Sequence, residues 1–212
     1  QVLKKMKEVL HMEIKVINNV PGLNVTINKS GDGSFAILLA EEKCKELGSK
    51  KPGSIAKIGN REYIVLGHAA ETTAIITKDC AAEMEFGDTA DYLTSKPRAY
   101  CIGDFYNELV EAVGKENIVK HTVKLMADDG TNKIVTRDNV SILTTELYRR
   151  YREFLPAIGK PYFTATRVSA EVPGYTGDVC CVDSFGVLYW RGCGWGYGVR
   201  PFCVLNSSVL VD

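Results

Sequence analysis

The stretch Tyr189-Trp-Arg-Gly-Cys-Gly-Trp-Gly-Tyr197 leads directly into Gly198-Val-Arg-Pro-Phe-Cys203, close to the end of a chain of 212 residues. Apolar and β-branched residues dominate from Val199 to Leu205, which predicts a β-strand there. From Pro161 onward helical periodicity is lost, and short extended segments alternate with glycine-rich loops. The C-terminal quarter is therefore predicted to be a loop-rich β region.

The glycine-aromatic stretch before this strand holds both tryptophans of the chain. Tyrosine and tryptophan offer a large contact area at low entropy cost, and glycine lets the backbone curve. A buried aromatic cluster is the alternative, but the four glycines from Gly192 to Gly198 supply little side-chain mass for a dense core. We expect an exposed binding surface in which Cys193 is a buried anchor and which Arg167 and Tyr175 join from the preceding loop. The predicted ligand-binding residues are Tyr189, Trp190, Arg191, Gly192, Gly194, Trp195, Gly196, Tyr197, Arg167 and Tyr175.

The segment before residue 49 predicts an N-terminal extension made of a helix and a β-hairpin. An amphipathic pattern over residues 2–11 predicts a short helix, and alternation over 13–17 predicts a strand. The turn Pro21-Gly22 joins this strand to a second one at 23–27 in a predicted β-hairpin, and a further strand is predicted at 35–39 after a Ser-Gly-Asp-Gly turn. Ala40 to Leu47 is predicted to form one or two helical turns. The extension is assigned to residues 1–48.

Residues 49–212 are predicted to form one larger domain. Three short apolar segments at 54–58, 62–66 and 73–77 predict an antiparallel meander. Apolar residues at helical spacing predict helices over 105–113 and 145–155. The sequence therefore predicts an α+β fold of mostly antiparallel short strands with two main helices.

Charge and hydropathy exclude several classes of partner. Lys and Arg number 26, as do Asp and Glu, so the formal net charge is zero and no global field attracts nucleic acid or an anionic membrane. No apolar run approaches the ~18 residues of a membrane span, and the N-terminal residues lack the apolar stretch of a secretory signal. The chain begins without Met, so a signal removed beforehand stays compatible with it. These features favour a cytoplasmic or virion-associated protein.

The titratable residues do not form a known catalytic or metal-binding pattern. The three histidines lie in different predicted elements, without the spacing of a metal site. Asp128 and Asp129 precede Gly130 in a predicted turn without further acids at EF-hand spacing. The arginines of the second helix predict a solvated face. We expect no cofactor, no metal and no catalysis.

The seven cysteines contain no Cys-x-x-Cys pair. Cys180 and Cys181 are adjacent in a predicted strand and should point to opposite faces, which disfavours a bond between them. Reduced and mostly buried thiols are the favoured interpretation. A disulfide involving Cys193 or Cys203 stays open as the alternative.

Several motifs together resemble a known family. Gly186-Val-Leu, Cys193 and Gly198-Val-Arg-Pro-Phe-Cys203 are spaced as in a domain of undefined function from gut Firmicutes and their phages. Ala127-Asp-Asp-Gly and Ser141-Ile-Leu-Thr-Thr-Glu-Leu-Tyr-Arg-Arg-Tyr resemble the same family, so the similarity covers about residues 50–212. Tyr162-Phe-Thr-Ala-Thr-Arg167 departs from the W-W-L-A-T-P-like run expected there.

The resemblance implies a C-type-lectin-like fold, as in the variable proteins of diversity-generating retroelements. It implies a receptor-recognition or display protein for an unidentified protein or cell-surface ligand, with its C-terminal loops diversified. Two alternatives stay open: an intracellular phage protein that inhibits a host factor, and an oxidase like the formylglycine-generating enzymes. Arg200 is expected to be structural and to pair with an acid such as Asp183 or Glu146. The residues assigned to the fixed scaffold are Gly186, Leu188, Cys193, Gly198, Val199, Arg200, Pro201 and Phe202.

Overall fold

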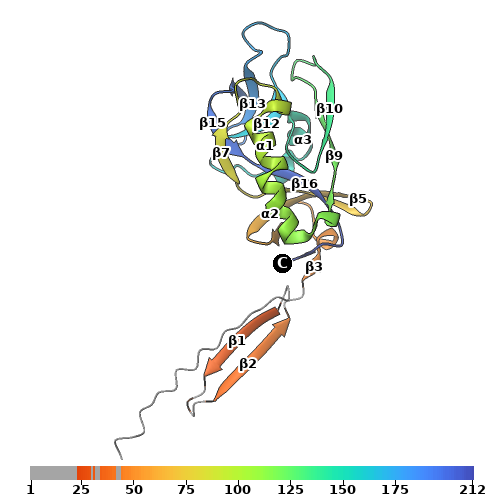
Figure 1. The fold of residues 1–212 in the computed structure, drawn as a ribbon, viewed down its shortest axis with the longest axis vertical. Coiled ribbons are helices and arrows are strands. Elements are labelled where there is room, and N and C mark those ends of the chain that lie inside the picture. Colours follow the sequence, from red (N-terminus) through yellow and green to blue (C-terminus); the bar gives the residue numbers. More distant parts are fainter. Residues whose placement is uncertain (1–22, 30, 32–33, 42–43) are drawn as a thin grey trace, which may run out of the picture. The chain divides into compact units, whose positions relative to one another are not determined.

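A computed structural model describes residues 23–29, 31, 34–41 and 44–212. The chain divides into two compact units, residues 1–43 and residues 44–212. In the first unit, β1 (Leu23–Lys29) pairs antiparallel with β2 (Phe35–Glu41), which confirms the predicted strands at 23–27 and 35–39 (Figure 1). The predicted hairpin joined residues 23–27 to residues 13–17 instead. The predicted helix over 2–11 and the predicted strand over 13–17 lie outside the described residues.

The boundary between the units falls a few residues before the predicted one. The strand β3 (Lys45–Glu46) pairs with β17 (Leu210–Val211) near the C-terminus. Leu47, in the short 3-10 helix Leu47–Ser49, is fully buried in the core of the second unit. The prediction of helical turns over residues 40–47 was wrong, because Ala40 and Glu41 continue the pairing of β2 with β1.

One sheet of the second unit is built around the predicted meander. Its path runs β11 (Val140–Ile142), β16 (Pro201–Asn206), β6 (Thr72–Thr77), β5 (Arg61–Ala69) and β4 (Ile55–Ile58). The short strand β8 (Ile118–Val119) also pairs with β16. The meander prediction is confirmed, and β16, from the C-terminal part of the chain, extends the same sheet beside β6.

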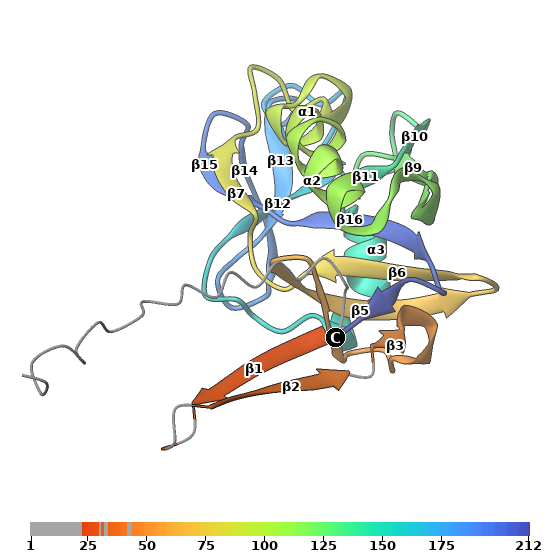
Figure 2. The same ribbon diagram turned by 60° about the horizontal axis from the view of Figure 1, so that its bottom comes forward.

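The second sheet carries the glycine-aromatic stretch. Its order is β14 (Leu188–Gly192), β13 (Asp178–Val182), β12 (Tyr162–Arg167), β15 (Gly196–Val199) and β7 (Ala82–Glu85). β12 and β15 are parallel and the other neighbours are antiparallel. The predicted strand from Val199 to Leu205 is in fact interrupted at Arg200, where the chain passes from β15 in this sheet to β16 in the other (Figure 2).

Three α-helices lie in the described part of the second unit. The predicted helix over 105–113 is confirmed as α2 (Asp104–Val113), whereas α3 (Thr145–Arg150) stops before the predicted end at 155 and is followed by the 3-10 helix Arg152–Phe154. The helix α1 (Lys96–Ile102) was not predicted. Its signals are Ser95, whose hydroxyl accepts a bond of 3.2 Å from the Arg98 amide, and a proline in the first turn.

Two smaller features were also missed. The strands β9 (His121–Leu125) and β10 (Ile134–Asp138) pair with each other in a two-stranded sheet separate from the two larger sheets. Short 3-10 helices span Tyr92–Thr94 and Lys115–Asn117. The described fold is thus α+β with mostly antiparallel strands, as predicted. No helix in these residues is long and apolar enough to cross a membrane.

The core of the second unit has two clusters of buried apolar side chains. The larger cluster includes Phe86, Phe105 and Phe163, and the aromatic rings of Phe86 and Phe163 meet edge to face at 5.2 Å. The smaller cluster includes Tyr148 and Tyr162. β13 supplies both clusters, since its alternate residues point to opposite faces.

Candidate functional site

The strand β14 sends its side chains to two different environments. Leu188 and Trp190 border a pocket, together with Cys180 of the neighbouring strand. Tyr189 packs against the larger core cluster, with Arg191 placed 5.4 Å above its ring. This alternation is the ordinary consequence of a strand, whose successive side chains point to opposite faces. Tyr189 nevertheless also contributes to the lining of the pocket, so only part of the predicted patch forms one exposed surface.

Tyr189 and Tyr197 take part in the core as well as in the surface. Their ring centroids are 6.2 Å apart, and Tyr197 lies 5.3 Å from the buried ring of Phe163. Burial and a hydrogen bond with Tyr197 raise the pKa of Tyr189 above its ordinary value. Both tyrosines are partly buried, so they support the sheet and present only part of their rings to solvent.

Trp190 and Trp195 are the exposed aromatic residues of this region, with 54% and 60% of their surface accessible. Trp195 ends a tight turn in which its amide donates to the carbonyl of Gly192 at 3.1 Å. Its indole lies over Gly192, where an added Cβ would be 3.7 Å from the ring. A Cβ at this distance would make an ordinary van der Waals contact, so the approach of the Trp195 indole does not require a glycine here.

The backbone of Cys193 holds this turn to its surroundings on both sides. Its amide donates to the carbonyl of Gly177 at 2.9 Å, and its carbonyl accepts from the amide of Phe86 at 2.9 Å. The side chain is only partly buried, in contrast to the predicted buried anchor. Hydrogen bonds of the main chain fix the turn, and the half-buried side chain packs against the larger core cluster. Gly194 and Gly196 are exposed and complete the turn.

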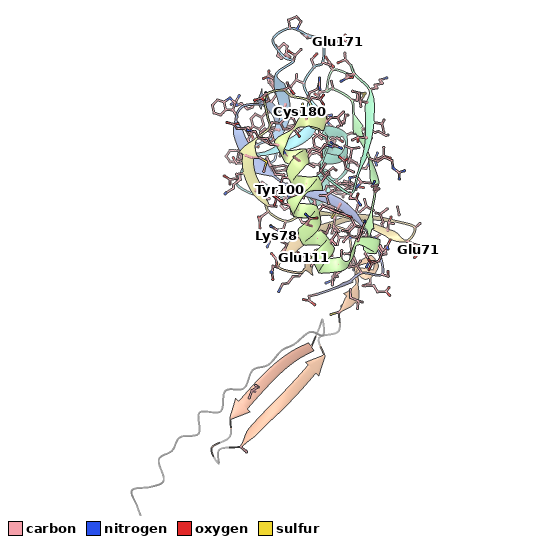
Figure 3. The ribbon with its side chains drawn as sticks, in the orientation of Figure 1. Glu71, Lys78, Tyr100, Glu111, Glu171 and Cys180 are labelled. Carbon is pink, nitrogen blue, oxygen red and sulfur yellow. The ribbon has the colours of Figure 1, made fainter. Side chains whose placement is uncertain are left out.

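A pocket of about 300 Å³ opens beside Trp190. Tyr175, with 45% of its surface exposed, contributes from the loop of residues 168–177, and Figure 3 shows Glu171 at the tip of this loop and Cys180 further inside. The hydroxyl of Ser169 accepts two amide hydrogen bonds that shape the start of the loop. The residues that line the pocket are Asp128, Thr145, Arg149, Val168, Tyr175, Cys180, Leu188, Tyr189 and Trp190.

The other side of this pocket is polar. Arg149 of α3 forms an ion pair of 3.1 Å with Asp128, and Thr145 donates to the same carboxylate oxygen at 3.3 Å. The sequence predicted a solvated turn and a solvated helix face for these residues. Twenty-one residues separate Arg149 from Asp128, and no local spacing signals their contact. The tertiary fold alone brings the ion pair to the aromatic residues.

Arg167 does not reach the aromatic surface as an exposed side chain. Only 19% of its side chain is accessible, and it forms an ion pair of 3.2 Å with Asp91. Its carbonyl accepts from the amide of Asp128 at 3.0 Å. Arg167 thus fastens the Asp128 turn to the end of β12, behind the pocket.

The site holds no cluster of activated titratable groups. Burial raises the pKa of the Cys180 thiol to about 12, so it stays protonated at neutral pH. Cys181 points into the larger core cluster, which confirms that the two adjacent cysteines face opposite sides. Across the described ranges, no group of three or more His, Cys, Asp or Glu side chains is placed to hold a metal ion.

Arg200 lies behind this site and is almost completely buried, with 1% of its surface exposed. Its guanidinium donates to the carbonyls of Thr77 at 2.8 Å and Lys78 at 2.9 Å, and to the hydroxyl of Tyr162 at 3.3 Å. The prediction of an acidic partner was wrong. Main-chain carbonyls take that place because the guanidinium lies where β6 ends and the chain changes sheets.

Comparison of this chain with family models, with curated proteins and with solved structures finds no match.

Proposed function

We propose that this chain is a ligand-binding protein of C-type-lectin-like fold, which recognises a macromolecular partner through the surface around Trp190, Trp195 and Tyr175. The observation that carries this proposal is the exposure of both tryptophans on a backbone fixed by sheet and turn hydrogen bonds. Large aromatic side chains held in place lose little entropy on binding and are enriched among residues that dominate binding energy.

The fold assignment is supported by the arrangement of the C-terminal segment. The Gly198-Val-Arg-Pro-Phe-Cys203 run, which carries the family resemblance, joins the two sheets through a buried arginine. The scaffold residues inferred from the resemblance include Gly198, whose added Cβ would overlap the Cys80 thiol. Buried scaffold beside exposed Trp190 and Trp195 is the distribution expected of a display protein with variable loops.

The retroelement origin of this surface is part of the proposal and has a direct genomic test. A reverse transcriptase gene and a near-repeat of the 3′ end beside this gene would support diversification. A phage gene neighbourhood without them would favour the intracellular inhibitor of a host factor. The oxidase alternative is disfavoured because Cys180 and Cys181 face opposite sides of β13 and cannot share one copper ion.

Alanine substitution tests the binding surface. Trp190→Ala and Trp195→Ala should each weaken binding to a partner recovered by pull-down by roughly 30-fold, the equivalent of about 2 kcal/mol. Their melting temperatures should stay close to that of the parent, because both side chains are exposed. Tyr197→Ala is the matched control: it should lower stability, since its ring packs on Phe163. Unchanged affinity in both tryptophan variants would place the binding surface elsewhere.

A further inference from the structure

Two further hollows adjoin the pocket beside Trp190 and extend it along one side of α3. A hollow of about 240 Å³ shares Asp128, Thr145 and Arg149 with the pocket. A third hollow of about 110 Å³ shares Lys124 and Glu146 with the second. The three together are called the α3 groove. It runs from Trp190, past Lys124, to the third hollow beside Arg150.

The two ends of the α3 groove differ in chemistry. The Trp190 end offers apolar and aromatic surface from Tyr175, Leu188 and Val168. Away from Trp190, Lys124, an exposed residue of β9, lines both the second and the third hollow. Among the described residues no ion-pair partner lies within reach of the Lys124 ammonium group, whereas Arg149 and Arg150 are paired with Asp128 and Glu146. The groove therefore carries a single uncompensated cation, which lies outside the pocket beside Trp190.

We propose that the α3 groove binds an extended peptide segment of the partner, with a bulky apolar side chain beside Trp190 and a carboxylate at Lys124. This inference rests on the proposed function, because it assigns a ligand class to the same surface. The apolar pocket supplies buried area, and the lysine supplies charge complementarity that fixes the direction of the segment.

The middle of the groove fits a peptide main chain. The guanidinium of Arg149 uses one nitrogen in its bond with Asp128, which leaves further N–H donors for peptide carbonyls. The carboxylates of Asp128 and Glu146 are partly exposed and can accept hydrogen bonds from peptide amides. Because each of these charges already has an opposite charge beside it, the middle attracts neutral amides more than phosphate groups.

The test uses the full chain and a phage-displayed library of random linear peptides. Selected peptides should share an aromatic or large aliphatic residue followed within a few positions by Asp or Glu. One such peptide is then titrated against the Trp195→Phe variant. Since the chain has two tryptophans, Trp190 is the only one left in this variant and reports directly on the pocket. The fluorescence emission of Trp190 should shift as peptide is added and should reach saturation.

Two further variants test where the carboxylate of the peptide binds and which tryptophan reports the binding. Lys124→Glu should weaken the selected peptide by roughly tenfold. Lys57→Glu, on the exposed face of β4 in the other sheet, is the matched control and should leave its affinity unchanged. In Trp190→Phe, the remaining indole of Trp195 should show no comparable shift.

Several results would overturn the inference. Peptides without the apolar-acidic pattern, or equal binding by Lys124→Glu and the parent, would exclude the proposed orientation. Neutral oligosaccharides that saturate the Trp190 signal when peptides do not would assign a different ligand class. If the tryptophan variants lose the macromolecular partner while no peptide is selected, the proposed function stands and the peptide inference fails. If the partner is also unaffected by these variants, both fail.

Discussion

Replacement of Arg200 should cost more stability than any exposed substitution in this chain. The guanidinium makes two short hydrogen bonds to carbonyl oxygens, at 2.8 and 2.9 Å, and a longer one to Tyr162. A hydrogen bond to a charged group contributes about 1.5 to 3 kcal/mol. Burial of a guanidinium without a carboxylate partner offsets part of this. Arg200→Ala should therefore lower the free energy of unfolding by about 4 kcal/mol, since the guanidinium, whose carbon lies 5.3 Å from the centre of the Tyr162 ring, also loses this contact.

Urea unfolding followed by far-UV circular dichroism measures this difference. Arg200→Lys keeps a positive charge but has no planar fork to reach both carbonyls, so it should recover less than half of the loss. Arg137→Ala, an exposed position on β10, is the control and should change stability by less than about 0.5 kcal/mol. A loss below about 1 kcal/mol for Arg200→Ala would refute the assignment of Arg200 as the side chain that joins the sheets.

Three other measurements examine the scaffold. Burial lowers the pKa of His121 from 6.5 to about 4, so folding favours the neutral ring. The free energy of unfolding should therefore be highest above pH 6.5 and should fall by about 3 kcal/mol as the pH drops toward 4. Urea unfolding at several pH values should show this loss, and the pH dependence should be weaker in His121→Gln. Gly198→Ala should lower the free energy of unfolding by roughly 1 to 3 kcal/mol because the new methyl overlaps the Cys80 thiol. Adding Cys80→Ala to this variant should restore part of the melting temperature. If the effects of the two substitutions on stability simply add, this clash is not the cause. Calcium addition or a chelator should leave the melting temperature unchanged, and a rise of several degrees with calcium would reveal a cation site.

Local sequence was sufficient for elements whose stabilising contacts are close in the chain. The meander from residue 54 to 77 follows from short apolar segments separated by turns, and α2 follows from apolar residues at helical spacing. The strands β1 and β2 were predicted for the same reason, but their pairing with each other was not. The helix α1 also has local signals in the sequence, namely a serine cap and a proline in its first turn, although it was not predicted.

The C-terminal segment shows where local reasoning fails. Its composition predicted exposed aromatic residues, but composition does not give the strand register that separates Trp190 from Tyr189. A shift of one residue would exchange the two faces, and only pairing with β13 sets it.

The sequence by itself determined the α+β class, the meander, the strands β1 and β2 and the helix α2, because propensity, apolar period and turn residues act over a few positions. The tertiary structure alone decided that Arg149 meets Asp128 beside Trp190, that Arg167 is held by Asp91, and that Arg200 is satisfied by carbonyls. Each of these contacts joins residues far apart in the chain. Their geometry depends on how the two sheets and α3 pack together, and no local pattern encodes that packing.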